Sequence, residues 1–264
     1  MKTYYYVHTG HRIGLDRFRR AVAVLNSLDA DITLLTSDYR IAQIAKDFGI
    51  EKCVGIDVVR NIPQIAIGGD RLIFDSDEAN PIMLEDMKIF FSSFFQIQNS
   101  TNVVHSKFFS KQEKNVELSY FFGDDDYGKD LEKRLDFIDG LNLHLQLGFY
   151  YFLDYEDMLR EKFSNCYDFE EYDEMILQSK VLLTASPQAV LDSLASGGKP
   201  IYFQREDYVR DYQELFEKLN IPIIFDYDKN HLNMILETIN DVNYVKITQK
   251  DNKIIDLIKE NLDL

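Results

Sequence analysis

The sequence predicts an α/β protein made of two similar halves that face a central cleft, each half a parallel sheet covered by helices. Short apolar runs alternate with helical patterns along the whole chain, which is typical of strands buried on both faces. A polar stretch at residues 98–115 interrupts this alternation once. The length of 264 residues is also enough for two small domains.

The first half is expected to contain four clear strands, at residues 4–7, 32–35, 52–54 and 71–74. Helices are expected from about Asp16 to Leu28 and over residues 38–48, the second ending at Gly49. The apolar run 89–97 fits a strand or a helix, because periodicity alone does not separate the two in so short a segment.

The second half repeats the alternation. Strands are expected at 116–122, 141–147, 166–167 and 222–225, and helices at 127–137, 154–162, 170–178 and 207–219. Two more helices are expected near the C-terminus. Strands that alternate with helices in this way favour a parallel sheet.

Residues 181–203 carry the clearest local signal: strand, tight turn, helix, Gly-Gly turn, strand. Ser186 and Pro187 suit the N-cap and the first helical position, and Gly197 follows the helix. The N-terminus of such a helix is a natural phosphate site. Asp192, further along the helix, is placed to reach a sugar hydroxyl. The segment therefore indicates both a fold and a class of ligand.

A glycine-containing loop, residues 8–14, follows the first strand and precedes a helix. This is the position of a phosphate or substrate loop, although Gly10 and Gly14 match neither GxGxxG nor the P-loop pattern. An ordinary turn between strand and helix is the alternative. His8 and His11 are the histidines nearest this loop, and neutral histidine can act as a general base.

Arginines gather in and after this loop in an otherwise acidic chain. Arginine binds phosphate or carboxylate through two parallel hydrogen bonds. We expect Arg12, in the loop, to face a ligand. Arg17 and Arg20 share one helix face, and we expect them to face solvent and pair with acidic neighbours.

Two acidic runs follow predicted strands. The run FDSDE at 74–78 places carboxylates where they can reach a ligand. Gly123 is followed by three aspartates, 124–126, which could help to hold a divalent cation or could cap the next helix. We favour the cap and predict no metal site.

Charge and cysteines narrow the class of protein. The net charge of −16 disfavours nucleic acid and anionic membranes as partners. Cys53 and Cys166 lie far apart without metal-ligand or CxxC spacing, which favours reduced thiols in the cytoplasm. No signal-peptide pattern opens the sequence, and the longest apolar run is too short to span a bilayer.

Two segments resemble the glycosyltransferase-B superfamily, in particular the UDP-sugar hydrolase of pseudaminic acid biosynthesis and lipid II N-acetylglucosaminyltransferase-like proteins. IGLDRFRRA at 13–21 looks like the first loop and helix of that hydrolase, and 180–202 looks like its nucleotide-binding strand–helix–strand. The resemblance implies two Rossmann-like domains. It also implies that Ser186 and Gln188 contact the diphosphate and that Asp192 contacts the ribose.

The chain departs from this family at two loops. The family carries a histidine at the start of the first helix, where this sequence has Asp16, while His11 lies five residues earlier. Both are therefore candidates for the catalytic base. The second-domain loop is usually Gly-Gly-Ser-like. Here Gly123 is followed by acidic residues, which would repel a diphosphate unless a cation or an arginine intervened.

The resemblance implies a nucleotide-sugar-dependent glycosyltransferase of bacterial surface glycan biosynthesis. Residues 1–100 would form the acceptor side and 115–264 the nucleotide side, the last helix being a candidate to pack back on the first domain. A UDP-sugar would be the donor and a glycan or small molecule the acceptor, with no resident cofactor. Gly10, Arg12, Gly14 and Gly123 would line the ligand site. A UDP-sugar hydrolase and a non-catalytic sugar- or partner-binding protein are the alternatives, and the oligomeric state stays open.

Overall fold

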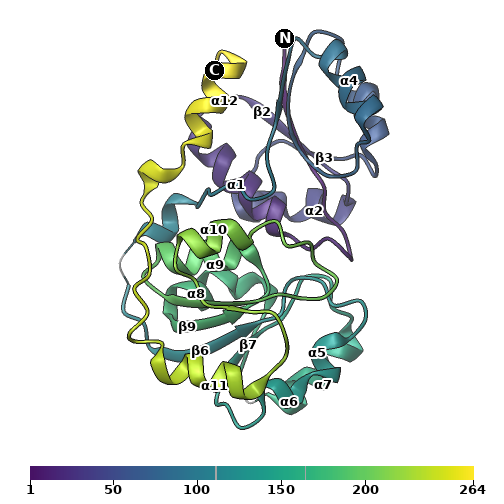
Figure 1. Ribbon diagram of the computed structural model, residues 1–264. Helices are drawn as coiled ribbons and strands as arrows, with labels where there is room; N and C mark the ends of the chain where they lie inside the picture. Colours follow the sequence, from purple (N-terminus) through teal and green to yellow (C-terminus); the bar gives the residue numbers. More distant parts are fainter. Residues whose placement is uncertain (111, 164) are drawn as a thin grey trace. The chain divides into compact units, whose positions relative to one another are not determined.

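The computed structural model describes residues 1–110, 112–163 and 165–264. The chain divides into two compact units, each built on its own parallel sheet with helices on both faces (Figure 1). Unit 1 comprises Met1–His105 and Lys250–Leu264, and unit 2 comprises Ser106–Gln249. The predicted α/β class with two Rossmann-like parallel sheets is confirmed.

Unit 1 holds a five-stranded sheet in the order β3-β2-β1-β4-β5, with every neighbouring pair parallel. Its strands are β1 (Thr3–Val7), β2 (Ile32–Thr36), β3 (Cys53–Gly55), β4 (Arg71–Asp75) and β5 (Ser93–Gln96). Its helices are α1 (Asp16–Leu28), α2 (Tyr39–Ile44), α3 (Ile62–Ile65), α4 (Pro81–Phe90) and α12 (Ile254–Leu262).

The central strand of unit 1 is buried on both faces. All five residues of β1 are buried, as expected when helices cover both sides of a parallel sheet. Tyr4 and Tyr6 alternate onto the face that packs against α3 and α4, where the ring of Tyr6 stacks on Phe74 with centroids 5.6 Å apart. The last helix, α12, packs on α1 and β5, so the end of the chain is part of this unit.

Unit 2 holds a six-stranded parallel sheet in the order β11-β10-β9-β6-β7-β8. Its strands are β6 (Val116–Phe121), β7 (His144–Gln146), β8 (Cys166–Tyr167), β9 (Ser179–Thr184), β10 (Lys199–Phe203) and β11 (Ile223–Ile224). Its helices are α5 (Asp130–Lys133), α6 (Leu135–Ile138), α7 (Leu153–Lys162), α8 (Tyr172–Gln178), α9 (Pro187–Ala195), α10 (Gln213–Lys218) and α11 (Lys229–Thr238). In Figure 1, α8, α9 and α10 cover one face of this sheet, and α6, α7 and α11 cover the other.

The strand order fixes where each sheet can bind a ligand. If the strands of unit 2 are renumbered along the chain from β6 as the first, their order in the sheet is 3-2-1-4-5-6, which is that of the Rossmann fold. Unit 1 has the same order without the sixth strand. The direction of winding reverses between β1 and β4 in unit 1, and between β6 and β9 in unit 2. Ligands of open α/β sheets bind outside the carboxyl ends of the strands at such reversals. We call these places the first and the second switch point.

Several elements are shorter than the sequence predicted. The helix expected over 127–137 is two short helices, α5 and α6, since Arg134 between them leaves the helical conformation. The helix expected from 207 begins at Gln213, because Asp207 and Tyr208 instead bond to other loop residues. The ambiguous run 89–97 contains the end of α4 and all of β5.

Candidate functional site

The loop after β1 is a rigid turn at the first switch point. Gly14 and Ile13 both donate their backbone N–H to the carbonyl of Gly10 at 3.0 Å. Gly14 has a φ of 73°, which glycine adopts without strain. Thr9 ties the loop to the end of β2, because its N–H donates to the Ser37 hydroxyl at 2.9 Å. The loop therefore holds its shape through its own hydrogen bonds.

His8 and Asp77 form a hydrogen-bonded pair at this switch point. His8 follows β1, Asp77 follows the neighbouring strand β4, and His8 Nδ1 lies 2.8 Å from Asp77 Oδ1. The other ring nitrogen, Nε2, is 3.9 Å from Glu78 Oε1. The hydrogen bond from His8, aided by the charge of Arg17, holds the pKa of Asp77 well below its usual range against the opposing effect of burial. Sequence reasoning noted both residues without pairing them.

A buried ion pair lies behind this dyad. The Arg20 guanidinium binds the carboxylate of Asp75 through Nε at 2.9 Å and through Nη2, and Tyr5 donates its hydroxyl to the same carboxylate at 3.0 Å. Both side chains of the pair are only 1% exposed. The expected pairing with acidic neighbours is present, but the expectation that Arg17 and Arg20 face solvent was wrong. A buried carboxylate at the end of β4 requires a partner inside the protein.

The two residues chosen from the sequence as catalytic, His11 and Asp16, lie in the loop and at the start of α1, respectively. His11 is exposed, and its Nε2 lies 3.0 Å from Nη2 of Arg40, which also pairs with Asp38. Asp16 is the first residue of α1 and is half-buried, and Arg12 is exposed. The structure thus pairs His11 with α2, whereas His8 pairs with the end of β4.

The residues expected to contact a nucleotide gather at the second switch point, along α9. The Ser186 hydroxyl caps the helix by accepting from Ala189 N–H at 3.1 Å. Gln188 donates its amide to Asp192 Oδ1 at 2.8 Å, and Tyr172 donates to Asp192 Oδ2 at 2.9 Å. All these side chains are buried. Gln188, Asp192 and Tyr172 therefore form one hydrogen-bonded group, and Ser186 caps the same helix, α9.

Two loops pack backbone against backbone beside this group. Gly123 follows β6 with a φ of 123°, and Gly148 follows β7. A Cβ on Gly148 would lie 2.6 Å from the carbonyl oxygen of Gly123, and a Cβ on Gly123 would lie 3.2 Å from Nη1 of Arg205. Only glycine fits at both positions, so this edge of the sheet is closely packed.

The three aspartates after Gly123 are buried and have different partners. Asp126 caps α5: its two carboxylate oxygens accept from the backbone N–H groups of Asp130 at 2.7 Å and Leu131 at 3.0 Å. Tyr155 donates its hydroxyl to the same carboxylate at 2.6 Å. The preferred helix-cap interpretation is confirmed for Asp126.

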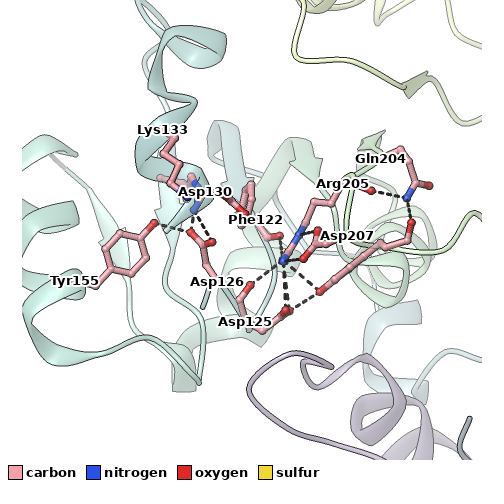
Figure 2. A network of polar contacts seen from close by, with 11 residues as sticks. Phe122, Asp125, Asp126, Asp130, Lys133, Tyr155, Gln204, Arg205 and Asp207 are labelled. Carbon is pink, nitrogen blue, oxygen red and sulfur yellow. Dashed lines mark hydrogen bonds and ion pairs between the residues drawn. The ribbon is translucent and has the colours of Figure 1, made fainter. Parts of the chain in front are cut away.

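Asp125 instead binds Arg205, which follows β10 (Figure 2). Arg205 donates from Nη1 to the Asp125 carbonyl at 2.7 Å, and its Nη2 lies 3.3 Å from the Asp125 carboxylate. Asp207 and Tyr208 complete the network. Burial raises the pKa of Asp125, while the charge of Arg205 and the Tyr208 hydroxyl oppose that rise. Arg205 thus offsets the charge of Asp125, and the sequence analysis did not identify it.

The described residues were also searched for a metal centre and for membrane-crossing helices. No group of three or more His, Cys, Asp or Glu side chains in residues 1–110, 112–163 and 165–264 could hold a metal ion. Within the same residues, no helix is both long and apolar enough to cross a membrane.

The comparisons with known proteins show the fold. No protein-family profile and no curated protein matches the sequence. The UDP-GlcNAc 2-epimerase of Methanocaldococcus jannaschii, solved with UDP-GlcNAc and UDP, matches with a TM-score of 0.59 at 9% identity, over 98% of this chain and 100% of its own. The spinosyn forosaminyltransferase SpnP matches with a TM-score of 0.51 at 8% identity, over 100% of both chains.

MurG of Acinetobacter baumannii matches with a TM-score of 0.50 at 13% identity, over 98% of this chain and 100% of its own. At such low identities the similarity is one of fold. The protein thus matches structures of the glycosyltransferase-B fold, which nucleotide-sugar glycosyltransferases and epimerases share.

Proposed function

We propose that this protein binds a nucleotide-sugar at the second switch point and transfers its sugar to an acceptor hydroxyl. One observation carries the proposal: the sheet of unit 2 reverses its winding between β6 and β9, where the Gly123 loop and the start of α9 follow the two strands. Rossmann-like sheets bind nucleotides at this place. The similar epimerase was solved with UDP-GlcNAc and UDP. We further propose a role in cytoplasmic steps of bacterial surface glycan synthesis.

The donor would be held by the group at the start of α9. The diphosphate would lie near Ser186 and Gln188, where the helix dipole favours negative charge. Asp192 would orient the Gln188 amide, with which it already shares a hydrogen bond, and would contribute to binding of the ribose. Because Arg205 offsets the charge of Asp125, the acidic loop would repel a diphosphate less than its sequence suggests.

A base for the acceptor hydroxyl is proposed at the first switch point. We assign the base to His8, because Asp77 accepts a hydrogen bond from its Nδ1 and Nε2 then carries the lone pair. His8 Nε2 would take the proton of the acceptor hydroxyl, whose oxygen would form a bond to the anomeric carbon. The bond from that carbon to the diphosphate would break, and the diphosphate would leave with the electron pair. Gly10, Arg12 and Gly14 remain proposed contacts to the substrate.

A non-catalytic binding protein is the second candidate, and one observation favours it. Gln188 and Asp192, two of the proposed nucleotide contacts, are buried and bonded to each other, and Asp192 also accepts from Tyr172. A fully satisfied group of this kind also stabilises the fold without any ligand. Hydrolysis of a UDP-sugar is the third candidate, with water in place of the acceptor hydroxyl.

Titration calorimetry with UDP tests nucleotide binding. We expect saturable binding that weakens in Gln188→Ala, and no heat at millimolar UDP would contradict the whole proposal. Release of UDP from UDP-sugars, measured with and without acceptors, then separates transfer, hydrolysis and binding alone.

Single substitutions identify the base. We expect His8→Gln to lower kcat by ~10²–10⁴-fold, the usual contribution of a general base. His11→Gln, in the same loop, and Asp16→Asn, at the start of α1, are the matched variants and should keep activity. Activity lost in either of these variants but kept in His8→Gln would move the base to that residue.

A further inference from the structure

Arg17 holds the carboxylate of Asp77 with both ends of its guanidinium group. Nη1 donates to Oδ1 at 3.1 Å, and Nη2 lies 3.0 Å from Oδ2. Arg17 is the second residue of α1, so its backbone is fixed by the helix. Bidentate pairs of this kind fix the plane of a carboxylate as well as its position.

Asp77 is held by this clamp and by its hydrogen bond with His8. Its side chain is 52% exposed, whereas that of Arg17 is 15% exposed. Arg17 is itself fixed from behind, since its Nη2 donates to Asn99 Oδ1 at 3.3 Å and its Nε lies 3.8 Å from the buried carboxylate of Asp75. A continuous set of fixed groups therefore runs from the Arg20–Asp75 pair in the core to the exposed Asp77.

The orientation of Asp77 determines which nitrogen of His8 carries the proton. An ionised carboxylate only accepts hydrogen bonds, so His8 Nδ1, 2.8 Å from Asp77 Oδ1, must be the donor. In the neutral imidazole Nε2 is then unprotonated. Glu78 Oε1 is 3.9 Å from Nε2, beyond hydrogen-bonding distance, and does not compete for this nitrogen.

We propose that Arg17 is a positioning residue that fixes the Nδ1–H tautomer of His8 by clamping Asp77. The catalytic meaning of this tautomer rests on the proposed function, but the tautomer itself is a property of the free protein. A lysine at position 17 keeps the charge and loses the planar fork. Arg17→Lys therefore separates orientation of Asp77 from simple electrostatic attraction.

Two-bond ¹H–¹⁵N NMR of ¹⁵N-histidine-labelled protein tests the proposal without substrate. Spectra are recorded above the histidine titration range, and the His8 signals are assigned by their loss in His8→Gln. We expect the Nδ1–H tautomer alone in the wild type and a mixture of tautomers in Arg17→Lys and Arg17→Gln. Arg40→Lys is the matched control, because Arg40 contacts His11, and it should change only the His11 signals.

Asp77→Ala completes a double-mutant cycle. It should give the same mixture as Arg17→Gln, and the double variant should show no further change. A wild-type His8 in the Nε2–H form, or an unaltered His8 in Arg17→Lys and Arg17→Gln, would overturn the proposal. If UDP-sugar turnover is found, Arg17→Lys should lower kcat about tenfold with KM little changed, less than the ~10²–10⁴-fold lost with His8 itself. Absence of turnover would count against the proposed function and leave the tautomer result standing.

Discussion

Arg205 donates from Nη1 to the backbone carbonyl of Asp125 at 2.7 Å, and this bond joins the loop after β10 to the loop after β6. The two side chains are 3% and 2% exposed, so their charges are compensated inside the protein rather than by water (Figure 2). Arg205 also lies over the rings of Phe122 and Tyr208, at 4.6 and 4.2 Å from the centroids. The pair therefore helps to shape the edge of the sheet at which we place the nucleotide.

Removing Arg205 should destabilise unit 2 strongly. Arg205→Met leaves the buried Asp125 carboxylate without its cation, which typically costs about 3–5 kcal/mol. Replacing both partners, in Arg205→Met with Asp125→Asn, should recover part of this loss, because no uncompensated charge stays buried. Thermal and urea unfolding measure both effects.

The matched control is the exposed pair of Lys218 and Glu214 on α10, whose charged atoms lie 2.7 Å apart. Lys218→Met should leave the unfolding midpoint almost unchanged, because exposed pairs are screened by solvent. Equal losses in Arg205→Met and Lys218→Met would show that the buried pair has no special role.

Methyl groups added at Gly123 and Gly148 should be poorly tolerated. Gly123→Ala forces a positive φ of 123° on alanine, a strain of about 1–3 kcal/mol. Gly148→Ala places Cβ 2.6 Å from the Gly123 carbonyl oxygen, so one of the two loops must move. Gly10→Ala is the control, because its Cβ meets nothing within 4 Å. We expect lower melting temperatures and weaker UDP binding for the first two variants, and unchanged melting for the third. A normal melting temperature in Gly148→Ala would contradict the described packing.

Most of the order of strands and helices could be predicted, because it depends on local patterns in the sequence, although α3 and most of α4 lie where no helix was expected. Strands buried on both faces appear as apolar runs, and the boundaries expected for the first helix are those of α1. Ser186 was likewise predicted as an N-cap from its position before Pro187. These features depend on neighbours within one helical turn, so no knowledge of the tertiary structure is needed.

The charged groups of the candidate site could not be predicted in this way, because their partners are distant in sequence. His8 and Asp77 are separated by 69 positions, Arg20 and Asp75 by 55, and Arg205 and Asp125 by 80. The pairs His8–Asp77 and Arg205–Asp125 form because parallel strands bring their carboxyl ends to one edge of the sheet, and Arg20 meets Asp75 because α1 packs back on its sheet. The apolar pattern of a strand does not predict which strand is its neighbour in the sheet, so the partners of these charged side chains could not be predicted.

The two cysteines should react slowly with thiol reagents in the native protein. They form no disulfide, and burial raises the pKa of Cys53 to about 11 and also raises the pKa of Cys166. Because the thiolate is the reactive form, only about one Cys53 in a thousand is reactive at pH 8. Reaction with a chromogenic disulfide at pH 8 should be slow in the native state and rapid for both thiols in urea. A native thiol that reacts as fast as free cysteine would contradict the raised pKa.

Asp77 should contribute to the acid sensitivity of unit 1. The hydrogen bond from His8 and the charge of Arg17 hold its pKa below the value of about 3.9 expected in the unfolded chain. A carboxylate with a lowered pKa stabilises the fold above the unfolded pKa, and the contribution disappears as the pH falls through the folded pKa. The effect should be modest because the side chain is half-exposed.

Asp77→Asn tests this dependence directly. The melting temperature of the wild type should exceed that of the variant near pH 5, and the difference should shrink as the pH falls below about 3.9, where Asp77 of the unfolded chain begins to take up a proton while the native carboxylate stays ionised. Asp31→Asn is the control, since Asp31 lies in the same unit, pairs with Lys52 at the surface and is 76% exposed. If the melting temperature of the wild type exceeded that of Asp77→Asn by a constant amount across this range, folding would not lower the pKa of Asp77. That result would contradict the ionic clamp by Arg17.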